Sequence, residues 1–264
     1  MGGRMITLLK LGGSVLTDKS KPYTARHSEI GRLAKEIGES LADIQGLKLI
    51  IGNGGGSFPH QPAKRGELHR GIRDAWQLEH LVETHRAAAE LNHILVTALV
   101  REGVPAIAVK PSSAAYAINN NIVDFNISML KELLKLGTVP VIHGDVLVDL
   151  ERGCSIASTE KLFLYLAQKL DVSRVVIGTD VDGVLDNTGN PIPMITPDTF
   201  NKIAHHVKGS GNTDVTGGML HKVETMLEML PFTHDIRIVN ATRPGEIKKA
   251  LEGQEVGTLI ASHA

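Results

Sequence analysis

Short runs of continuous apolar residues alternate with longer segments of helical periodicity along nearly the whole chain. The runs predict strands over Ile6–Lys10, Leu47–Ile51, Ala106–Val109, Val139–Ile142, Val175–Gly178, Ile236–Val239 and Thr258–Ile260. The periodic segments predict helices over Glu29–Leu41, Leu78–Glu102, Met129–Leu136, Thr159–Leu170, Met219–Leu230 and Pro244–Leu251. Strands that are apolar on both faces are typical of a sheet covered by helices on both sides. The chain is therefore predicted to be an α/β protein, an αβα sandwich with a mainly parallel central sheet.

The size and charge of the chain restrict its domain organisation and its partners. Its 264 residues carry a net charge of −1, without a run of lysines or arginines. This argues against nucleic acid and against an anionic membrane as partners. We expect a single domain over residues 1–264. A turn signal at Glu151–Gly153 predicts two lobes, about 1–153 and 154–264.

The single cysteine, Cys154, excludes an intrachain disulfide and favours a reducing compartment. The apolar stretch near the start, Ile6–Leu9, is too short for the core of a signal peptide. The chain has no run of the roughly 18 apolar residues that a membrane-spanning helix needs. We therefore expect a cytoplasmic protein.

Two glycine-bearing loops follow the first two predicted strands. They are Lys10–Ser14, with Gly12 and Gly13, and Gly52–Ser57, with three consecutive glycines. Neither is a dinucleotide fingerprint or a P-loop. Glycines let backbone N–H groups approach a phosphate closely, although ordinary turns remain the alternative. His60, shortly after the second loop, is a candidate donor to a phosphate oxygen.

Three further loops have the same character. His143–Asp145 and Thr179–Gly183 each follow a predicted strand, and Asp214–Lys222 contains Gly217 and Gly218. The last glycine pair precedes a helix whose free N–H groups would favour phosphate, with Lys222 one turn inside it. Simple turns and a surface lysine are the alternative interpretation. Because ligands of open α/β sheets gather at the carboxyl ends of strands, we expect these loops to lie together.

The longest predicted helix has leucines at helical spacing: Leu81, Leu91, Leu95 and Leu99. We interpret them as a core face. The alternative is that part of this stripe, with the Ala106–Tyr116 region, walls an apolar substrate pocket. Two glycine-rich stretches are predicted as functional loops: Asp182–Pro193 as a β-hairpin flap, and Lys208–Gly218 before a helix.

In this order the loops resemble the amino acid kinase superfamily, whose pattern is K-x-G-G-S, G-G-G, G-D, T-D-V-D-G and G-G-M-x-x-K. The finer pattern resembles the isopentenyl phosphate kinases. It is carried by Thr17–Lys19, Gly54–Phe58 with His60, Thr84-His85, Leu91-Asn92 and Asp214–Gly218. That family phosphorylates isopentenyl phosphate to the diphosphate with Mg-ATP, in isoprenoid biosynthesis and the mevalonate pathway. A histidine at the place of His60 is typical of members whose acceptor already bears a phosphate.

The resemblance implies a role for each matching residue. The catalytic set would be Lys10, Lys19, His60, Glu160 and Lys222. The ATP-binding set would be Lys10, Gly12, Gly13, Ser14, Gly55, Thr179, Asp180, Asp182, Gly217 and Lys222. The acceptor phosphate would contact Gly56, His60 and Gly144. The resemblance further implies Mg²⁺ that arrives with ATP, no metal site of the protein itself, and a homodimer. The N-terminal lobe would bind the acceptor, and the C-terminal lobe would bind the nucleotide.

The chain departs from the family pattern in three places. Asn53 stands where histidine is usual, and Pro59 stands where glycine is usual. The family's S-G-D-D segment reads Ser158-Thr159-Glu160-Lys161, so that Glu160 stands where an aspartate is thought to hold the active-site lysines. These departures leave alternatives open. One is a related kinase of another phosphate monoester or a phosphonate, similar to fosfomycin kinase or uridylate kinase. Another is a non-catalytic nucleotide-binding protein.

Overall fold

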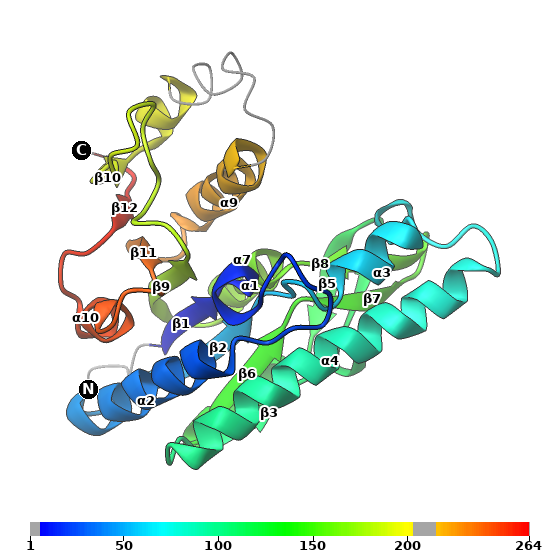
Figure 1. Ribbon diagram of the computed structural model, residues 1–264, viewed down its shortest axis with the longest axis horizontal. Helices are drawn as coiled ribbons and strands as arrows, with labels where there is room; N and C mark the ends of the chain where they lie inside the picture. Colours follow the sequence, from blue (N-terminus) through cyan, green and yellow to red (C-terminus); the bar gives the residue numbers. More distant parts are fainter. Residues whose placement is uncertain (1–5, 203–214, 264) are drawn as a thin grey trace.

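The structure is a computed structural model that describes residues 6–202 and 215–263 (Figure 1). Its centre is an eight-stranded sheet in the order β10-β12-β11-β9-β1-β2-β6-β3. The strands are β1 (Ile6–Leu11), β2 (Lys48–Asn53), β3 (Ala106–Ala108), β6 (Val139–His143), β9 (Val172–Thr179), β10 (Met194–Ile195), β11 (Asp235–Asn240) and β12 (Thr258–Ile260). Every pairing in this sheet is parallel except that of β11 with β12.

Helices cover both faces of this sheet, so the predicted αβα sandwich is confirmed. One face packs against α6 (Ile127–Lys135), α7 (Thr159–Lys169) and α9 (Val215–Met229). The other packs against α1 (Gly13–Leu16), α2 (His27–Asp43), α4 (Gln77–Arg101) and α10 (Glu246–Glu252). Leu8 and Leu9 of β1 are both buried but belong to different cores, as the two-residue period of a strand requires. Continuous apolar strands therefore mark the central sheet, as expected.

A second sheet, which the sequence pattern did not indicate, has the order β5-β4-β7-β8. Its strands are β4 (Ala115–Ile118), β5 (Asn121–Phe125), β7 (Asp145–Asp149) and β8 (Gly153–Ala157). They are short and carry polar residues, so they lack the apolar runs that identify central strands. The tight β4–β5 turn has Asn119 and Asn120 at φ of 48° and 66°. The carboxylate of Asp149 accepts both of their N–H groups, at 3.0 and 2.7 Å, and thereby ties this turn to β7.

The Glu151–Gly153 turn signal lies where β7 leads into its antiparallel partner β8. The predicted lobe boundary therefore falls at a hairpin turn, and the division into lobes stays a prediction. The predicted hairpin at Asp182–Pro193 is closed by one antiparallel bridge between Leu185 and Pro191. Of the predicted loop Lys208–Gly218, residues 208–214 lie outside the described residues.

Short helices make up the remaining connections: α3 (His60–Arg65), the 3₁₀ turn η1 (Leu68–Arg70) and α5 (Pro111–Ala114). Each is too short to produce a readable helical period. In the described part of the chain, none of the helices has the length and apolar character needed to cross a membrane.

Candidate active site

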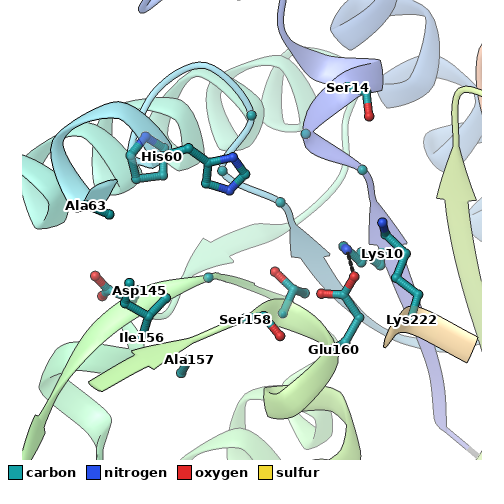
Figure 2. Close-up of a pocket in the computed structure, with 18 of the residues that line it drawn as sticks. Lys10, Ser14, His60, Ala63, Asp145, Ile156, Ala157, Ser158, Glu160 and Lys222 are labelled. Carbon is teal, nitrogen blue, oxygen red and sulfur yellow. Dashed lines mark hydrogen bonds and ion pairs between the residues drawn. The ribbon is translucent and has the colours of Figure 1, made fainter. Parts of the chain in front are cut away.

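A cavity of about 470 Å³ opens at the carboxyl ends of β1, β2, β6 and β9 (Figure 2). It collects most of the predicted site residues: Lys10, Gly12, Gly13, Ser14, Lys19, Gly55, Gly56, His60, Gly144, Glu160, Thr179, Asp180 and Lys222. In Figure 2, Lys10, Glu160 and Lys222 lie at one end of the view, and His60 and Ala63 lie toward the other. Parallel strands therefore bring together loops that are far apart in the sequence.

The loops after β1 and β2 touch each other through their backbones. A methyl group at Gly13 would lie 2.2 Å from the backbone nitrogen of Gly56. The N–H of Gly12 donates to Gly178 O at 2.9 Å, and that of Gly54 donates to Leu11 O at 2.9 Å. Within the described residues, the N–H groups of Gly13, Ser14, Gly55 and Gly56 have no such acceptor. The two loops together therefore present free N–H donors of the kind that bind phosphate oxygens.

Lys10 at the end of β1 forms a buried ion pair with Glu160, in the first turn of α7. Ser158 caps this helix by accepting the N–H of Lys161 at 3.2 Å, which fixes where its first turn begins. Burial by itself would raise the pKa of Glu160, but the charge and hydrogen bond of Lys10 lower it to about 2. Glu160 is therefore ionised near neutral pH, and it holds the Lys10 ammonium group in the cavity.

Two further lysines of the predicted site reach the same cavity. Lys222 comes from α9, and its Nζ donates to Gly218 O at 3.3 Å. Burial lowers the pKa of Lys222, and the positive charge of Lys10 lowers it further. Lys19 is exposed and comes from the loop over residues 17–26. Lys64 of α3 also lines the cavity, so four ammonium groups surround it and favour a ligand with several negative charges.

His60 is the first residue of α3 and is open to the cavity. The surrounding protein atoms, followed by the charges of Lys19 and Lys10, lower its pKa. Its imidazole is therefore neutral near pH 7 and offers one N–H donor. Pro59 before it accepts the N–H of Ala63 at 3.1 Å, and a methyl group on Gly55 would lie 2.3 Å from Pro59 Cγ. The proline that departs from the family pattern is thus packed against the glycine loop.

Asn53, the second departure, is buried and joins several elements of the site. Its Oδ1 accepts from Asn92 of α4 at 2.9 Å, and its carbonyl oxygen accepts from Thr159 Oγ1 at 2.7 Å. The same carbonyl accepts the N–H of Gly144 at 3.2 Å. Gly144 therefore lines the cavity, but the N–H group that a phosphate would need is occupied in this structure.

The loops predicted to border the nucleotide divide into two groups. Thr179 and Asp180 line the cavity. Asp182 is absent from the lining, and its carboxylate accepts from Asn240 at 2.8 Å and from Arg243 at 2.5 Å. Gly217 lies in the first turn of α9. The carboxylate of Asp182 thus joins its loop to the end of β11, which is a different role from the predicted contact with ATP.

The far end of the cavity, called the apolar end below, is lined by apolar side chains that lie beside the carboxylate of Asp145 (Figure 2). Ala63 of α3 and Val146, Ile156 and Ala157 of the second sheet line it. Ala63, Val146 and Ile156 share a hydrophobic cluster with Leu68, Ile72, Leu81 and Cys154. The predicted Ala106–Tyr116 wall contributes no lining residue. Leu91, Leu95 and Leu99 lie in the core, as predicted.

The family model for the amino acid kinase family matches residues 5–240. The isopentenyl phosphate kinase of Methanocaldococcus jannaschii is 36% identical, over 97% of this chain and 98% of the relative. That of Methanothermobacter thermautotrophicus is 35% identical, over 96% of this chain and 98% of the relative. A solved structure described as an isopentenyl phosphate kinase superposes with a TM-score of 0.83 at 30% identity, over 97% of this chain and 100% of the other.

These matches run through the strands and loops that build the cavity. They agree with the order of the glycine-bearing loops and with the observed sheet. The chain therefore belongs to the amino acid kinase family, and the relatives described above, which it matches along nearly their whole length, are isopentenyl phosphate kinases.

Proposed function

We propose that this protein transfers the γ-phosphoryl group of ATP to isopentenyl phosphate and releases isopentenyl diphosphate and ADP. The observation that carries the proposal is one cavity with a polar and an apolar end. Three lysines and the free N–H groups of two glycine loops occupy the polar end, and His60 lies between them and an apolar pocket. An acceptor with a phosphate head and a short hydrocarbon tail matches this arrangement. The product would enter isoprenoid biosynthesis, and a place in the mevalonate pathway stays a prediction.

For phosphoryl transfer, the protein mainly has to position the two substrates and stabilise the negative charge of the transferred group. The acceptor's phosphate oxygen is already ionised near neutral pH, so the reaction needs no general base. The acceptor oxygen attacks the γ-phosphorus of ATP, and the bond from that phosphorus to the β–γ bridging oxygen breaks. We assign Lys10, Lys19 and Lys222 to the negative charge that spreads over the transferred group. Gly13, Ser14 and Gly55 are assigned to the phosphates of ATP, and Gly56 and His60 to the acceptor phosphate.

Magnesium would arrive as the complex with ATP. Among the described residues, there is no group of three histidine, cysteine or carboxylate side chains that could hold a metal ion. Mg²⁺ is commonly bound through substrate phosphates and one or two carboxylates, and it keeps several waters. Asp180 lines the cavity and forms no hydrogen bond or ion pair with another side chain among the described residues, so its carboxylate is placed to contact such a complex. The ion would offset charge on the ATP phosphates.

The first test is turnover. With ATP and Mg²⁺, the protein is expected to form ADP and isopentenyl diphosphate from isopentenyl phosphate, measured by coupled ADP release and product mass. A panel containing fosfomycin, uridylate and simple phosphate monoesters serves as the control. Robust turnover of a panel member with none for isopentenyl phosphate would replace the proposed acceptor. ATP binding without turnover of any acceptor would support a non-catalytic nucleotide-binding protein.

His60 offers a second test, because its assigned role concerns only the acceptor. His60→Ala is expected to lower kcat/KM for isopentenyl phosphate by about 10²-fold, the usual cost of one lost donor to a reacting group. The KM for ATP should stay within about twofold, because His60 is not assigned to ATP. His93→Ala is the matched control, since His93 is exposed on α4 and absent from the cavity lining. Equal losses for both substrates would contradict the assignment.

The homodimer implied by the family resemblance and the cytoplasmic location stay predictions. The single buried cysteine is compatible with a reducing compartment. Sedimentation velocity at micromolar concentration would measure the oligomeric state.

A further inference from the structure

We propose that Glu83 of α4 is a positioning residue that fixes the Lys19-bearing loop and the His60-bearing helix relative to each other at the cavity. The inference rests on the proposed function. Glu83 itself is absent from the cavity lining, although its neighbour Thr84 lines it. Glu83 therefore acts through the groups that it holds.

The first of these groups is the loop over residues 17–26, which runs from α1 toward α4 before it enters α2 (Figure 1). The hydroxyl of Tyr23 donates to Glu83 Oε1 at 2.6 Å. The Tyr23 ring meets Phe58 edge to face, with 5.7 Å between the ring centroids, and the Arg86 guanidinium lies 6.0 Å from its centroid. Tyr23 is thereby fixed by groups from both the glycine loop and α4.

The backbone of Tyr23 indicates that this position is imposed by its surroundings. Its φ is +51°, a left-handed conformation that is uncommon for a bulky residue. Such conformations persist where the surrounding structure over-determines them, and they cluster at functional sites. The N–H of Tyr23 also donates to Ser57 O at 3.2 Å. The loop over residues 17–26 therefore packs in one defined position against the glycine loop Gly52–Ser57.

Hydrogen bonds within the loop over residues 17–26 connect Tyr23 to Lys19. Fixing the position of Tyr23 therefore also restricts the position of Lys19. Asp18 Oδ1 accepts from Ser20 N and Ser20 Oγ, at 2.9 and 2.7 Å, on either side of Lys19 in the chain. Asp18 N donates to Thr24 O at 2.9 Å, and Thr17 and Ala25 form an antiparallel bridge. The loop thus behaves as one small unit whose position sets the reach of Lys19.

The second group is α3. Arg65, its last residue, donates from Nη2 to both carboxylate oxygens of Glu83, at 2.8 and 2.9 Å. His60 is the first residue of the same six-residue helix. Displacement of Arg65 would therefore displace His60 with it. One carboxylate thus joins two segments, one of which carries Lys19 and the other His60.

The charge state of Glu83 agrees with this role. The hydrogen bond from Tyr23 and the charge of Arg65 hold the pKa of Glu83 below its usual range. Burial and the same hydrogen bond raise the pKa of Tyr23. Near neutral pH, Tyr23 is thus a donor and Glu83 an ionised acceptor.

Amide hydrogen exchange tests whether Glu83 restrains the two segments, and it needs no assay of activity. Glu83→Gln is expected to speed amide exchange in residues 17–26 and 60–65 by about two- to tenfold, the range of one net hydrogen bond. Tyr23→Phe, which removes only the hydroxyl, should affect the first segment, and Arg65→Gln should affect the second. The matched control is Glu132→Gln, which breaks an exposed ion pair with Lys135 on α6. Unchanged exchange in both segments of Glu83→Gln would overturn the proposal.

Kinetics separate positioning from general stability. Glu83→Gln is expected to lower kcat/KM for isopentenyl phosphate by about 10- to 100-fold, as misplaced groups do, while the KM for ATP stays within about twofold. Parallel loss for both substrates together with a lowered Tm would mean that Glu83 is merely structural. If the wild type does not phosphorylate isopentenyl phosphate, the proposed function fails, and the exchange measurement alone decides whether Glu83 joins the two segments.

Discussion

Replacement of Glu160 by glutamine is expected to lower kcat by about 10²–10³. This is the usual cost of losing one preorganised donor to a reacting group, and the donor displaced here is the Lys10 ammonium group. The buried ammonium of Lys10 would lose its only ionic partner among the described residues. Breaking one partner of a buried pair typically costs about 3–5 kcal/mol, because an uncompensated charge remains. The unpaired ammonium group would leave its place beside α7, and this displacement removes positive charge from the phosphoryl site.

Glu160→Asp is the matched variant, because it keeps the charge and supplies the residue that is usual in the family. It should retain more activity than Glu160→Gln, since the first turn of α7 places either carboxylate toward Lys10. Both kcat and the free energy of unfolding should be measured. A Glu160→Gln enzyme with wild-type kcat would show that Lys10 needs no partner.

The pH dependence of stability gives a separate readout of the same pair. The folded pKa of Glu160, about 2, lies below its ordinary value of 4.5. A carboxyl group with a depressed folded pKa stabilises the protein above its ordinary pKa, and this contribution is lost as the pH falls toward the folded value. Wild-type stability should thus fall between about pH 4.5 and 2. The corresponding slope should be shallower in Glu160→Gln.

Gly13→Ala is expected to damage the phosphate site directly. Its methyl group would lie 2.2 Å from the backbone nitrogen of Gly56, and a backbone atom cannot rotate away as a side chain can. Separating the two loops should cost about 1–3 kcal/mol of stability, the usual penalty of overpacking. It should lower kcat/KM for both substrates by about 10²-fold, because the free N–H groups of both loops would move.

Gly31→Ala in α2 is the control for this substitution. No heavy atom lies within 4 Å of the added methyl group, so the change should stabilise the helix by about 0.5–1 kcal/mol. Urea unfolding and steady-state kinetics on both variants would decide. If Gly13→Ala keeps wild-type kcat/KM, the contact between the loops is not needed for phosphate binding.

Which side chains gather at the cavity was predictable to a large extent. Lys10 ends a strand that the sequence predicts to be fully buried, and the glycines after it mark a loop that can approach a phosphate closely. Because parallel strands end at one edge of a sheet, residues at those ends had to lie together. The apolar end was not predictable, since Val146 and Ile156 lie on short strands of a second sheet without a distinctive pattern.

The departures from the family pattern were visible in the sequence, but their consequences were not. Glu160 could be placed in the first turn of the predicted helix Thr159–Leu170. Its partner Lys10 lies 150 residues away, and only the folded chain brings them together. Likewise, the carbonyl of Asn53 occupies the N–H of Gly144, which the motif alone presents as a free donor.

The sequence by itself therefore determined the sandwich, the order of its phosphate-binding loops and the kinase family. These three features depend on hydrophobic periodicity and on short sequence motifs that contain glycine and lysine. The tertiary structure alone decided which N–H groups remain free, how the cavity's apolar end is built, and that Glu83 joins the Lys19 loop to α3. Those features depend on contacts between segments that are distant in the chain, which no local pattern encodes.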